Sequence, residues 1–102
     1  MRPIHLAQLD KTRPVLLLTR AVAVGRLSTV TVAEITSRIH GLHTEVLVGP
    51  SNGLDHESAV NLDNMHTIAL SQLGRQVGTL LSSQEGALLA AMVAAFDLET
   101  DD

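Results

Sequence analysis

The sequence contains no cysteine, tryptophan or tyrosine, and Phe96 is its single phenylalanine. Without cysteine the chain can form neither a disulfide framework nor a thiolate metal site. With so few aromatic residues, any nucleic-acid contact has to do without stacking platforms of Phe, Tyr or Trp. The hydrophobic fraction is nevertheless 45%, so the core must be built from Leu, Val, Ile and Ala.

Long apolar segments are also missing. Residues 1–6 contain no apolar signal core, and the longest apolar run, from Ala87 to Phe96, is far shorter than the roughly 20 residues of a membrane-spanning helix. A chain of 102 residues has room for one domain with one hydrophobic core. We therefore expect a single domain spanning residues 1–102, cytoplasmic and not attached to a membrane.

Positive charge is scarce and unevenly placed. The chain carries 7 Lys and Arg against 11 Asp and Glu, a net charge of −4. Residues 1–44 hold six cations and two acids, a net charge of +4, whereas residues 45–102 hold one cation and nine acids, a net charge of −8. A basic half can place a positive face on one side of the fold, which suits a polyanion. A solvated surface with unevenly distributed charges is the alternative.

Short apolar and β-branched segments separated by turn residues predict a mainly β fold. We expect strands over residues 5–10, 14–19, 29–35, 44–48, 58–62, 65–69 and 76–80. A loop or a single helical turn is expected over residues 20–27, and the sequence Gly-Pro-Ser-Asn-Gly at 49–53 is a strong turn cluster. This many short strands in so short a chain indicate a small barrel.

The C-terminal segment has a helical pattern instead. Ser82 and Glu85 have the spacing of a capping box at the start of a run of good helix formers. Five large apolar residues recur at helical spacing and are predicted to share one face: Leu88, Leu89, Met92, Val93 and Phe96. The other positions are mostly alanine, so a helix over residues 83–96 can be covered on two sides. Core packing and a dimer or partner interface both remain open for it.

Three segments taken together resemble the MazF/PemK family of bacterial toxins. The first is Lys11-Thr12-Arg13-Pro14-Val15-Leu16, which matches the family's Arg-Pro-Val strand. The second is Ile35-Thr36-Ser37, followed by Gly41-Leu42 and Thr44-Glu45-Val46. The third is Ser58-Ala59-Val60-Asn61-Leu62-Asp63-Asn64, followed by Thr67-Ile68, Leu73-Gly74 and Val77-Gly78. Their order and spacing extend the resemblance over nearly the whole chain.

The resemblance implies a small SH3-like antiparallel barrel with a C-terminal α-helix, assembled as a symmetric homodimer. It also implies the toxin component of a type II toxin–antitoxin system. Such toxins are sequence-selective endoribonucleases that cleave single-stranded RNA, typically messenger RNA, by attack of a 2′-hydroxyl group and without a metal or other cofactor. They are held inactive by a cognate antitoxin, an acidic and partly disordered protein that wraps the active face.

This reaction needs a base near the 2′-hydroxyl, an acid near the leaving 5′-oxygen, and stabilisation of the charge on the phosphorane. Arg13 matches the family's catalytic arginine, and its planar guanidinium can grip two phosphate oxygens. Thr36 matches the second active-site position, where a hydroxyl can donate to a phosphate oxygen. Ser37 can assist it. Alternatively, Arg13 is an ordinary surface arginine that flanks a strand, and the hydroxyls of Thr36 and Ser37 form hydrogen bonds with the local backbone.

Further polar residues are candidates for proton transfer or RNA contact. His40 and His43 follow Thr36 in the next loop, and an imidazole titrates near neutrality. Asp63 matches a position where the family often has Asp, and it would contact a base or orient Arg13. The remaining candidates are Asn61 and His66 near that strand, and Lys11, Arg20 and Arg38 as RNA-binding cations. The spacing of the histidines does not predict a metal site.

Two departures from the family pattern bear on activity. Residues 9–12 close the first loop directly, where the family usually has a longer loop that helps to cover RNA, so any acidic helper in that loop is expected to be absent. Glu34 stands where a proline is common and puts a negative charge near the expected phosphate site. The alternative is therefore a non-catalytic CcdB-like binding toxin, or a catalytically weakened member that acts through its antitoxin. A generic small β domain is a third possibility.

Overall fold

Six strands form one antiparallel sheet in the computed structural model, which describes residues 2–99. They are β1 (Arg2–Gln8), β2 (Thr12–Leu17), β3 (Thr29–Thr36), β4 (Glu45–Val48), β5 (Ser58–Ala69) and β6 (Leu73–Leu80). The strand order across the sheet is β4-β5-β3-β2-β1-β6. The described chain also contains one α-helix, α1 (Glu85–Phe96), and four short 3₁₀ helices: η1 (Ala21–Ala23), η2 (Pro50–Asn52), η3 (Leu70–Gln72) and η4 (Ser82–Gln84).

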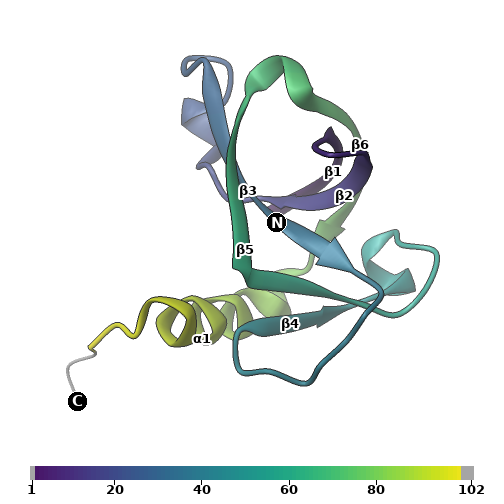
Figure 1. Ribbon diagram of the computed structural model, residues 1–102, viewed down its shortest axis with the longest axis vertical. Helices are drawn as coiled ribbons and strands as arrows, with labels where there is room; N and C mark the ends of the chain where they lie inside the picture. The colour runs from purple at the N-terminus through teal and green to yellow at the C-terminus, as the bar shows by residue number, and fades with distance from the viewer. Residues whose placement is uncertain (1, 100–102) are drawn as a thin grey trace.

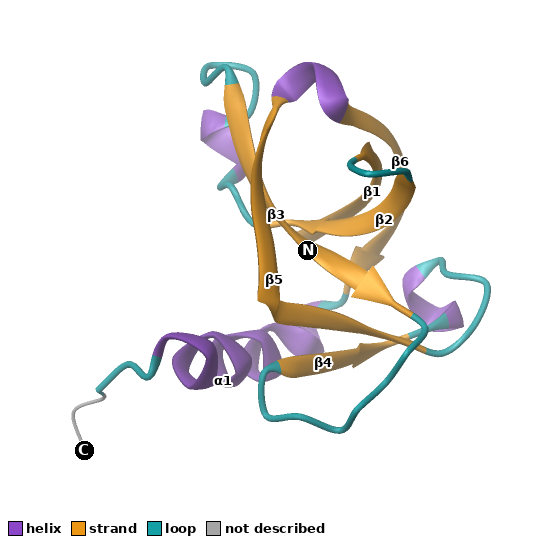
Figure 2. Cartoon of the chain, in the orientation of Figure 1, coloured by secondary structure: helices purple, strands orange, loops and turns teal. Residues whose placement is uncertain are grey.

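The sheet curls on itself into a half-barrel (Figures 1 and 2). β5 pairs with β3 and β6 pairs with β1, so η3 carries the chain from one side of the curl to the other. β4 and β6 are the two edge strands of the open sheet, and α1 lies below the curl beside β4. The predicted fold class, mainly β with a C-terminal helix, is confirmed in this form.

The core is aliphatic and has two parts, one on each face of the sheet. The larger cluster packs the sheet against α1 and includes Leu16. The smaller cluster lies inside the curl and includes Val15 and Leu17. Because successive residues of a strand point to opposite faces, β2 buries an apolar side chain on both sides. This explains its unbroken apolar run, in which Val15, Leu16 and Leu17 are each at most 3% exposed.

The predicted strands at residues 58–62 and 65–69 are one continuous strand, β5, so their separation was wrong. Ala33 of β3 faces Met65, but the next residue, Glu34, faces Asn61, which leaves residues 62–64 of β5 without partners in β3. Extra residues of this kind make a bulge that bends a strand without ending it. The polar pair Asp63-Asn64 therefore marks the bulge and not a loop.

The predicted capping box at the helix start was also wrong. The Glu85 carboxylate does not turn back to Ser82 but binds the Arg2 guanidinium, with Nη2 and Oε1 2.6 Å apart. Instead, Gln84 Oε1 accepts the N–H of Leu81 at 2.9 Å, and the 3₁₀ turn η4 leads into α1. Glu85 thus forms a long-range ion pair, and Gln84 supplies the local cap in its place.

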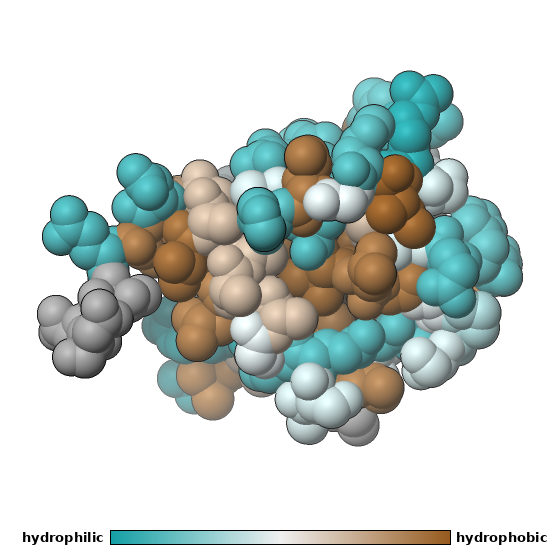
Figure 3. Space-filling view, turned by 90° about the horizontal axis from the view of Figure 1, so that it is seen from below, coloured by the Kyte–Doolittle hydropathy of each residue, from teal (hydrophilic) through white to brown (hydrophobic). Residues whose placement is uncertain are grey.

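The buried face of α1 differs from the predicted one. Leu88 and Ala91 are 2% and 1% exposed, and Met92 and Ala95 pack beside them. Leu89 and Phe96, which were expected on the same face as Leu88, are 66% and 52% exposed. Of the alanines, only Ala91 and Ala95 lie on the side that meets the sheet, and the other three are exposed together with these two large residues. Figure 3, which views the molecule from below, shows a broad apolar area on this side.

Candidate active site

A surface groove of about 600 Å³ lies where the start of β2 meets the end of β3. Arg13 and Thr36, the predicted catalytic pair, both line it, together with Lys11 and Ser37. We call it the Arg13–Thr36 groove. β2 and β3 are antiparallel neighbours in which Val15 faces Glu34, so the beginning of one strand lies next to the end of the other. Strand pairing therefore brings the two predicted residues to one site.

Two carboxylates hold the Arg13 guanidinium. Its Nε donates to Asp10 Oδ1 at 2.8 Å and its Nη2 donates to Asp10 Oδ2 at 3.0 Å, while Glu34 Oε1 lies 3.6 Å from Nε. The hydrogen bond from Arg13 lowers the pKa of Asp10 well below its usual range, and the same bond raises the pKa of Arg13. Because the guanidinium has five N–H donors, this pairing leaves donors free for a phosphate group.

Asp10 is a residue that the sequence analysis missed. The shortened loop was expected to lack an acidic group, yet Asp10 in that loop puts a carboxylate directly on Arg13. The i, i+3 spacing of an acid and an arginine at the short loop of residues 9–12 was the available signal. Asp10 Oδ1 also accepts the N–H of Lys11 at 3.0 Å. The carboxylate is thus fixed to the turn that precedes Arg13.

Thr36 is half-buried at the end of β3. Its Oγ1 accepts the N–H of Arg38 at 3.1 Å, which is the local backbone role that the sequence left open. A hydroxyl that accepts in this way keeps its own proton for donation. Ser37 follows it as an exposed residue on the same groove wall. Both hydroxyls are therefore placed to donate to a group bound beside Arg13.

A second hollow, about 510 Å³, also has Arg13 in its wall, and we call it the Glu34 pocket. Besides Arg13 and Glu34 its lining includes His66 and Asn64. His66 Nε2 lies 2.6 Å from Glu34 Oε2. Of the histidines predicted for the site, His66 is thus the one that the structure connects to Arg13, and it does so through Glu34.

Other predicted residues lie away from the groove. His40 and His43 are exposed in the loop between β3 and β4, and neither lines the Arg13–Thr36 groove or the Glu34 pocket. Asp63 accepts a hydrogen bond from the Thr44 hydroxyl at 2.6 Å, so it holds the end of that loop and does not orient the Arg13 guanidinium. Asn61 Oδ1 accepts the N–H of Asp63 at 2.9 Å. Neither residue lines the Arg13–Thr36 groove or the Glu34 pocket.

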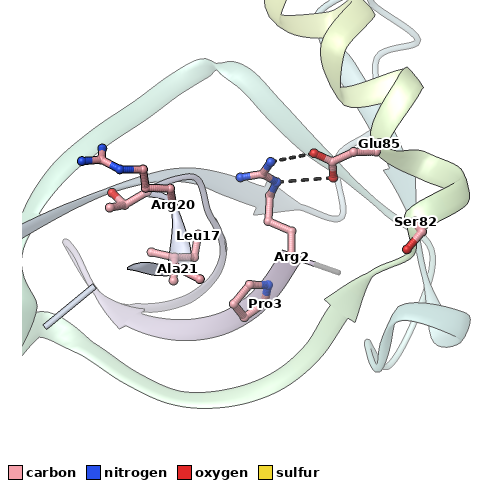
Figure 4. Close-up of a pocket in the computed structure, with 8 residues that line it drawn as sticks. Arg2, Pro3, Leu17, Arg20, Ala21, Ser82 and Glu85 are labelled. Atoms are coloured by element: carbon pink, nitrogen blue, oxygen red, sulfur yellow. Dashed lines mark hydrogen bonds and ion pairs between the residues drawn. The ribbon is translucent and has the colours of Figure 1, made fainter. Parts of the chain in front are cut away.

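The three predicted RNA-binding cations do not all lie at the groove. Lys11 lines the groove, and Arg38 is exposed two residues beyond Thr36. Arg20 instead lines a separate pocket of about 360 Å³ near the other end of β2. In that pocket the Arg2 guanidinium faces the Glu85 carboxylate and Arg20 points away from the pair (Figure 4). Arg20 is thus not part of the groove, because β2 separates it from Arg13.

The opposite wall of the groove comes from segments that no sequence pattern connected to Arg13. Arg75 of β6 and Asp55 and His56 of the loop after η2 line it. Asn52 anchors this loop, with Oδ1 accepting the N–H of Gly49 at 3.0 Å and Nδ2 donating to the carbonyl oxygen of Thr79 at 2.9 Å. The curl of the sheet brings β6 and this loop beside β2.

Among residues 2–99, no group of three or more His, Asp and Glu residues is arranged to hold a metal ion. Within the same range, no helix is long and apolar enough to cross a membrane.

Comparisons with known proteins identify the family of the chain. A family described as the PemK-like, MazF-like toxin of type II toxin–antitoxin systems matches residues 3–96. The endoribonuclease MazF3 of Mycobacterium tuberculosis is 58% identical over 99 residues, which cover 97% of this chain and 96% of that protein. The solved structure of M. tuberculosis toxin MazF-mt6 is 56% identical, with a TM-score of 0.95 over 97% of this chain and 100% of that chain.

A mycobacterial endoribonuclease solved in complex with its cognate antitoxin shares the fold at 22% identity, with a TM-score of 0.85 over 97% of this chain and 95% of that chain. The fold is therefore common to near and distant relatives. The chain belongs to the PemK-like, MazF-like toxins of type II toxin–antitoxin systems, an endoribonuclease family whose fold and class of activity are those predicted from the sequence.

Proposed function

We propose that this toxin cleaves single-stranded RNA, above all messenger RNA in the cytoplasm, at selected sequences and without a metal ion. The observation that carries the proposal is the presence of Arg13 and Thr36 in one groove, with Lys11 and Arg75 beside them. Three cations in a groove can bind the RNA backbone despite the net charge of −4. The groove supplies charge and hydroxyl donors where a bent phosphodiester would sit.

In this mechanism the 2′-oxygen forms a bond to the adjacent phosphorus and the bond from phosphorus to the 5′-oxygen breaks. The products end in a 2′,3′-cyclic phosphate and a 5′-hydroxyl. Arg13 stabilises the charge of the phosphorane, and Thr36 donates to a phosphate oxygen and positions it. Asp10 orients the guanidinium through Nε and Nη2, which leaves the remaining N–H groups for the phosphate oxygens.

A base takes the proton of the 2′-hydroxyl, and an acid gives a proton to the leaving 5′-oxygen. Asp10 is a poor base because its pKa is held well below the usual range by Arg13. An imidazole suits both roles, and His56 is a histidine that lines the groove itself. His56 is therefore the first residue to test as a proton carrier, ahead of His40 and His43.

We also infer that the toxin is a homodimer joined through the outer side of α1. Glu85 is the one charged residue of this helix, whereas a solvent-facing helix usually carries a charged face. Leu89 and Phe96 of α1 and Leu47 of the neighbouring β4 are 66%, 52% and 62% exposed. An exposed apolar area of this kind marks an interaction surface. In a symmetric dimer the same area of each copy would cover that of the other.

A cognate antitoxin is the second partner that we propose. The family belongs to two-component systems, and one structural neighbour was solved with its antitoxin. Lys11 and Arg75 give the groove a positive rim, which suits an acidic, partly disordered segment that competes with RNA. The antitoxin would then block cleavage by occupying the groove.

The test is incubation of the purified protein with a long mixed-sequence RNA in the presence of EDTA. We expect discrete fragments ending in a 2′,3′-cyclic phosphate, and we expect the Arg13→Ala variant to lose at least about 100-fold in rate while staying folded. Arg26→Ala is the matched control, because Arg26 is exposed and lies outside the groove lining. Intact RNA from the folded wild-type protein would contradict the enzyme mechanism. Growth arrest by the Arg13→Ala variant would favour a CcdB-like binding toxin.

A further inference from the structure

We propose that the Glu34 pocket is a nucleobase subsite that selects a base with an exocyclic amino group next to the cleaved phosphate. Glu34 is the residue that reads this base. The inference rests on the proposed RNA cleavage and assigns part of its sequence selectivity to named side chains.

The position of the pocket determines which nucleotide it holds. Arg13 belongs to the lining of both the Arg13–Thr36 groove and the Glu34 pocket. A phosphate bound by its free N–H groups therefore lies at the boundary between the two hollows. A base that enters the Glu34 pocket belongs to a nucleotide directly flanking that phosphate.

The pocket has the surfaces that an unstacked base requires. Its volume is about 510 Å³, and its apolar lining includes half-buried Leu9 and buried Ile68. Proteins stack single-stranded bases on aromatic rings, on histidine or on the plane of an arginine guanidinium. This chain has no Trp or Tyr, but the pocket contains both the His66 ring and the Arg13 guanidinium. Stacking is thus available without Phe, Tyr or Trp.

The polar groups of the pocket favour a base that donates. The Glu34 side chain is 15% exposed, and its carboxylate lies 2.6 Å from His66 Nε2 and 3.6 Å from Arg13 Nε. A carboxylate has about four lone-pair sites, so Glu34 can accept one more hydrogen bond. Carboxylates accept from the amino group of cytosine, whereas the O4 atom of uracil is itself an acceptor.

Asp10 is the main partner that positions Arg13, and Glu34 makes a longer contact with it. Asp10 already binds the same Nε at 2.8 Å, and it adds a second bond to Nη2 at 3.0 Å. The contact from Glu34 is longer, 3.6 Å, and its short contact is to His66. Removal of the Glu34 charge is therefore expected to change which RNA sequence is cut more than how fast a good site is cut.

The first experiment compares the wild-type protein with Glu34→Gln by sequencing the 5′ ends of fragments from a long RNA. Wild-type sites should have an amino-bearing base at one position flanking the cut. Glu34→Gln, which replaces an acceptor with an amide donor, should relax the preference against uracil there by about tenfold. Glu57→Gln is the matched control, since Glu57 lines a different hollow beside η2. Identical motifs for wild type and Glu34→Gln, or uracil at both flanking positions in wild type, would overturn the proposal.

A binding measurement separates this inference from the cleavage mechanism. Cytidine and adenosine 3′-monophosphates cannot be cleaved, and we expect them to shift the NMR signals of the His66 ring and the Asn64 amide more than uridine 3′-monophosphate does. These shifts without any RNA cleavage would leave the subsite standing and reject the proposed reaction. RNA cleavage together with equal responses to all three nucleotides would reject the subsite alone.

Discussion

Asp10 and Arg13 form a two-point ion pair across the tight turn between β1 and β2, with N–O distances of 2.8 and 3.0 Å. The turn also carries Lys11, whose N–H binds the same carboxylate. A two-point pair fixes the plane of the guanidinium as well as its position. A loop shorter than that of the family thus still supplies an acidic partner for the arginine that the mechanism needs.

Asp10→Asn should slow RNA cleavage by roughly tenfold or more, because a misplaced catalytic group is costly even when the fold is intact. The effect should appear mainly in kcat, since Asp10 carries no positive charge that holds RNA. Steady-state kinetics on a fluorogenic RNA would measure it. Asp55→Asn is the control: Asp55 lines the same groove, but no ion pair joins it to Arg13. Equal kcat values for Asp10→Asn and wild type would remove Asp10 from the mechanism.

The Asp10–Arg13 pair should remain intact over the whole neutral and mildly acidic range. The pKa of Asp10 is lowered in the folded protein, chiefly by the hydrogen bond from Arg13. A carboxyl group with a lowered pKa contributes its stabilising effect fully above its unfolded pKa of about 3.9 and loses it as the pH falls through the folded value. In Arg13→Gln the pKa of Asp10 should return toward that unfolded value. A titration of the carboxyl groups followed by NMR would measure the pKa of Asp10 in both proteins. An ordinary pKa for Asp10 in wild type would contradict the pairing.

Gly78→Ala should destabilise the protein and displace one wall of the groove. A Cβ atom at Gly78 would lie 1.8 Å from the carbonyl oxygen of Asn52, so the loop anchored by Asn52 would have to move. We expect a loss of about 1–3 kcal/mol in the free energy of unfolding, as for other overpacked sites. Gly86→Ala is the control. It has no atom within 4 Å of the added Cβ and should stabilise α1 by roughly 0.5–1 kcal/mol. Urea denaturation measures both, and similar unfolding midpoints would show that the close approach is absent.

Leu89→Lys should convert the proposed dimer into a monomer, because it places a charge at the centre of the exposed side of α1. Sedimentation velocity at several protein concentrations would show the change in mass. Val22→Lys is the matched control, since Val22 is 73% exposed but lies in η1, away from α1. A wild-type protein that sediments as a monomer at high concentration would contradict the proposed assembly, and a dimer of Leu89→Lys would place its interface elsewhere.

Local sequence patterns were enough to predict most strands of the fold and the two catalytic candidates. Residues 29–35 and 44–48 were recognisable as strands from their β-branched and alternating residues, and the observed strands β3 and β4 overlap them. The cluster at 49–53 marked a turn that closes with Gly53 at a φ of 92°. These features depend on neighbours in the chain, which a pattern can describe. Arg13 and Thr36 were found because their short motifs resemble those of a toxin family.

The surroundings of those two candidates depend on contacts between distant segments of the chain. Arg75 and His56 reach the groove because the sheet curls, and His66 reaches Glu34 because β3 and β5 are paired neighbours in the sheet. The burial of Leu88 and the exposure of Leu89 followed from the side on which α1 meets the sheet. Each of these contacts joins segments far apart in the chain, and their distances depend on strand register, curl and packing. A local sequence pattern contains none of those quantities.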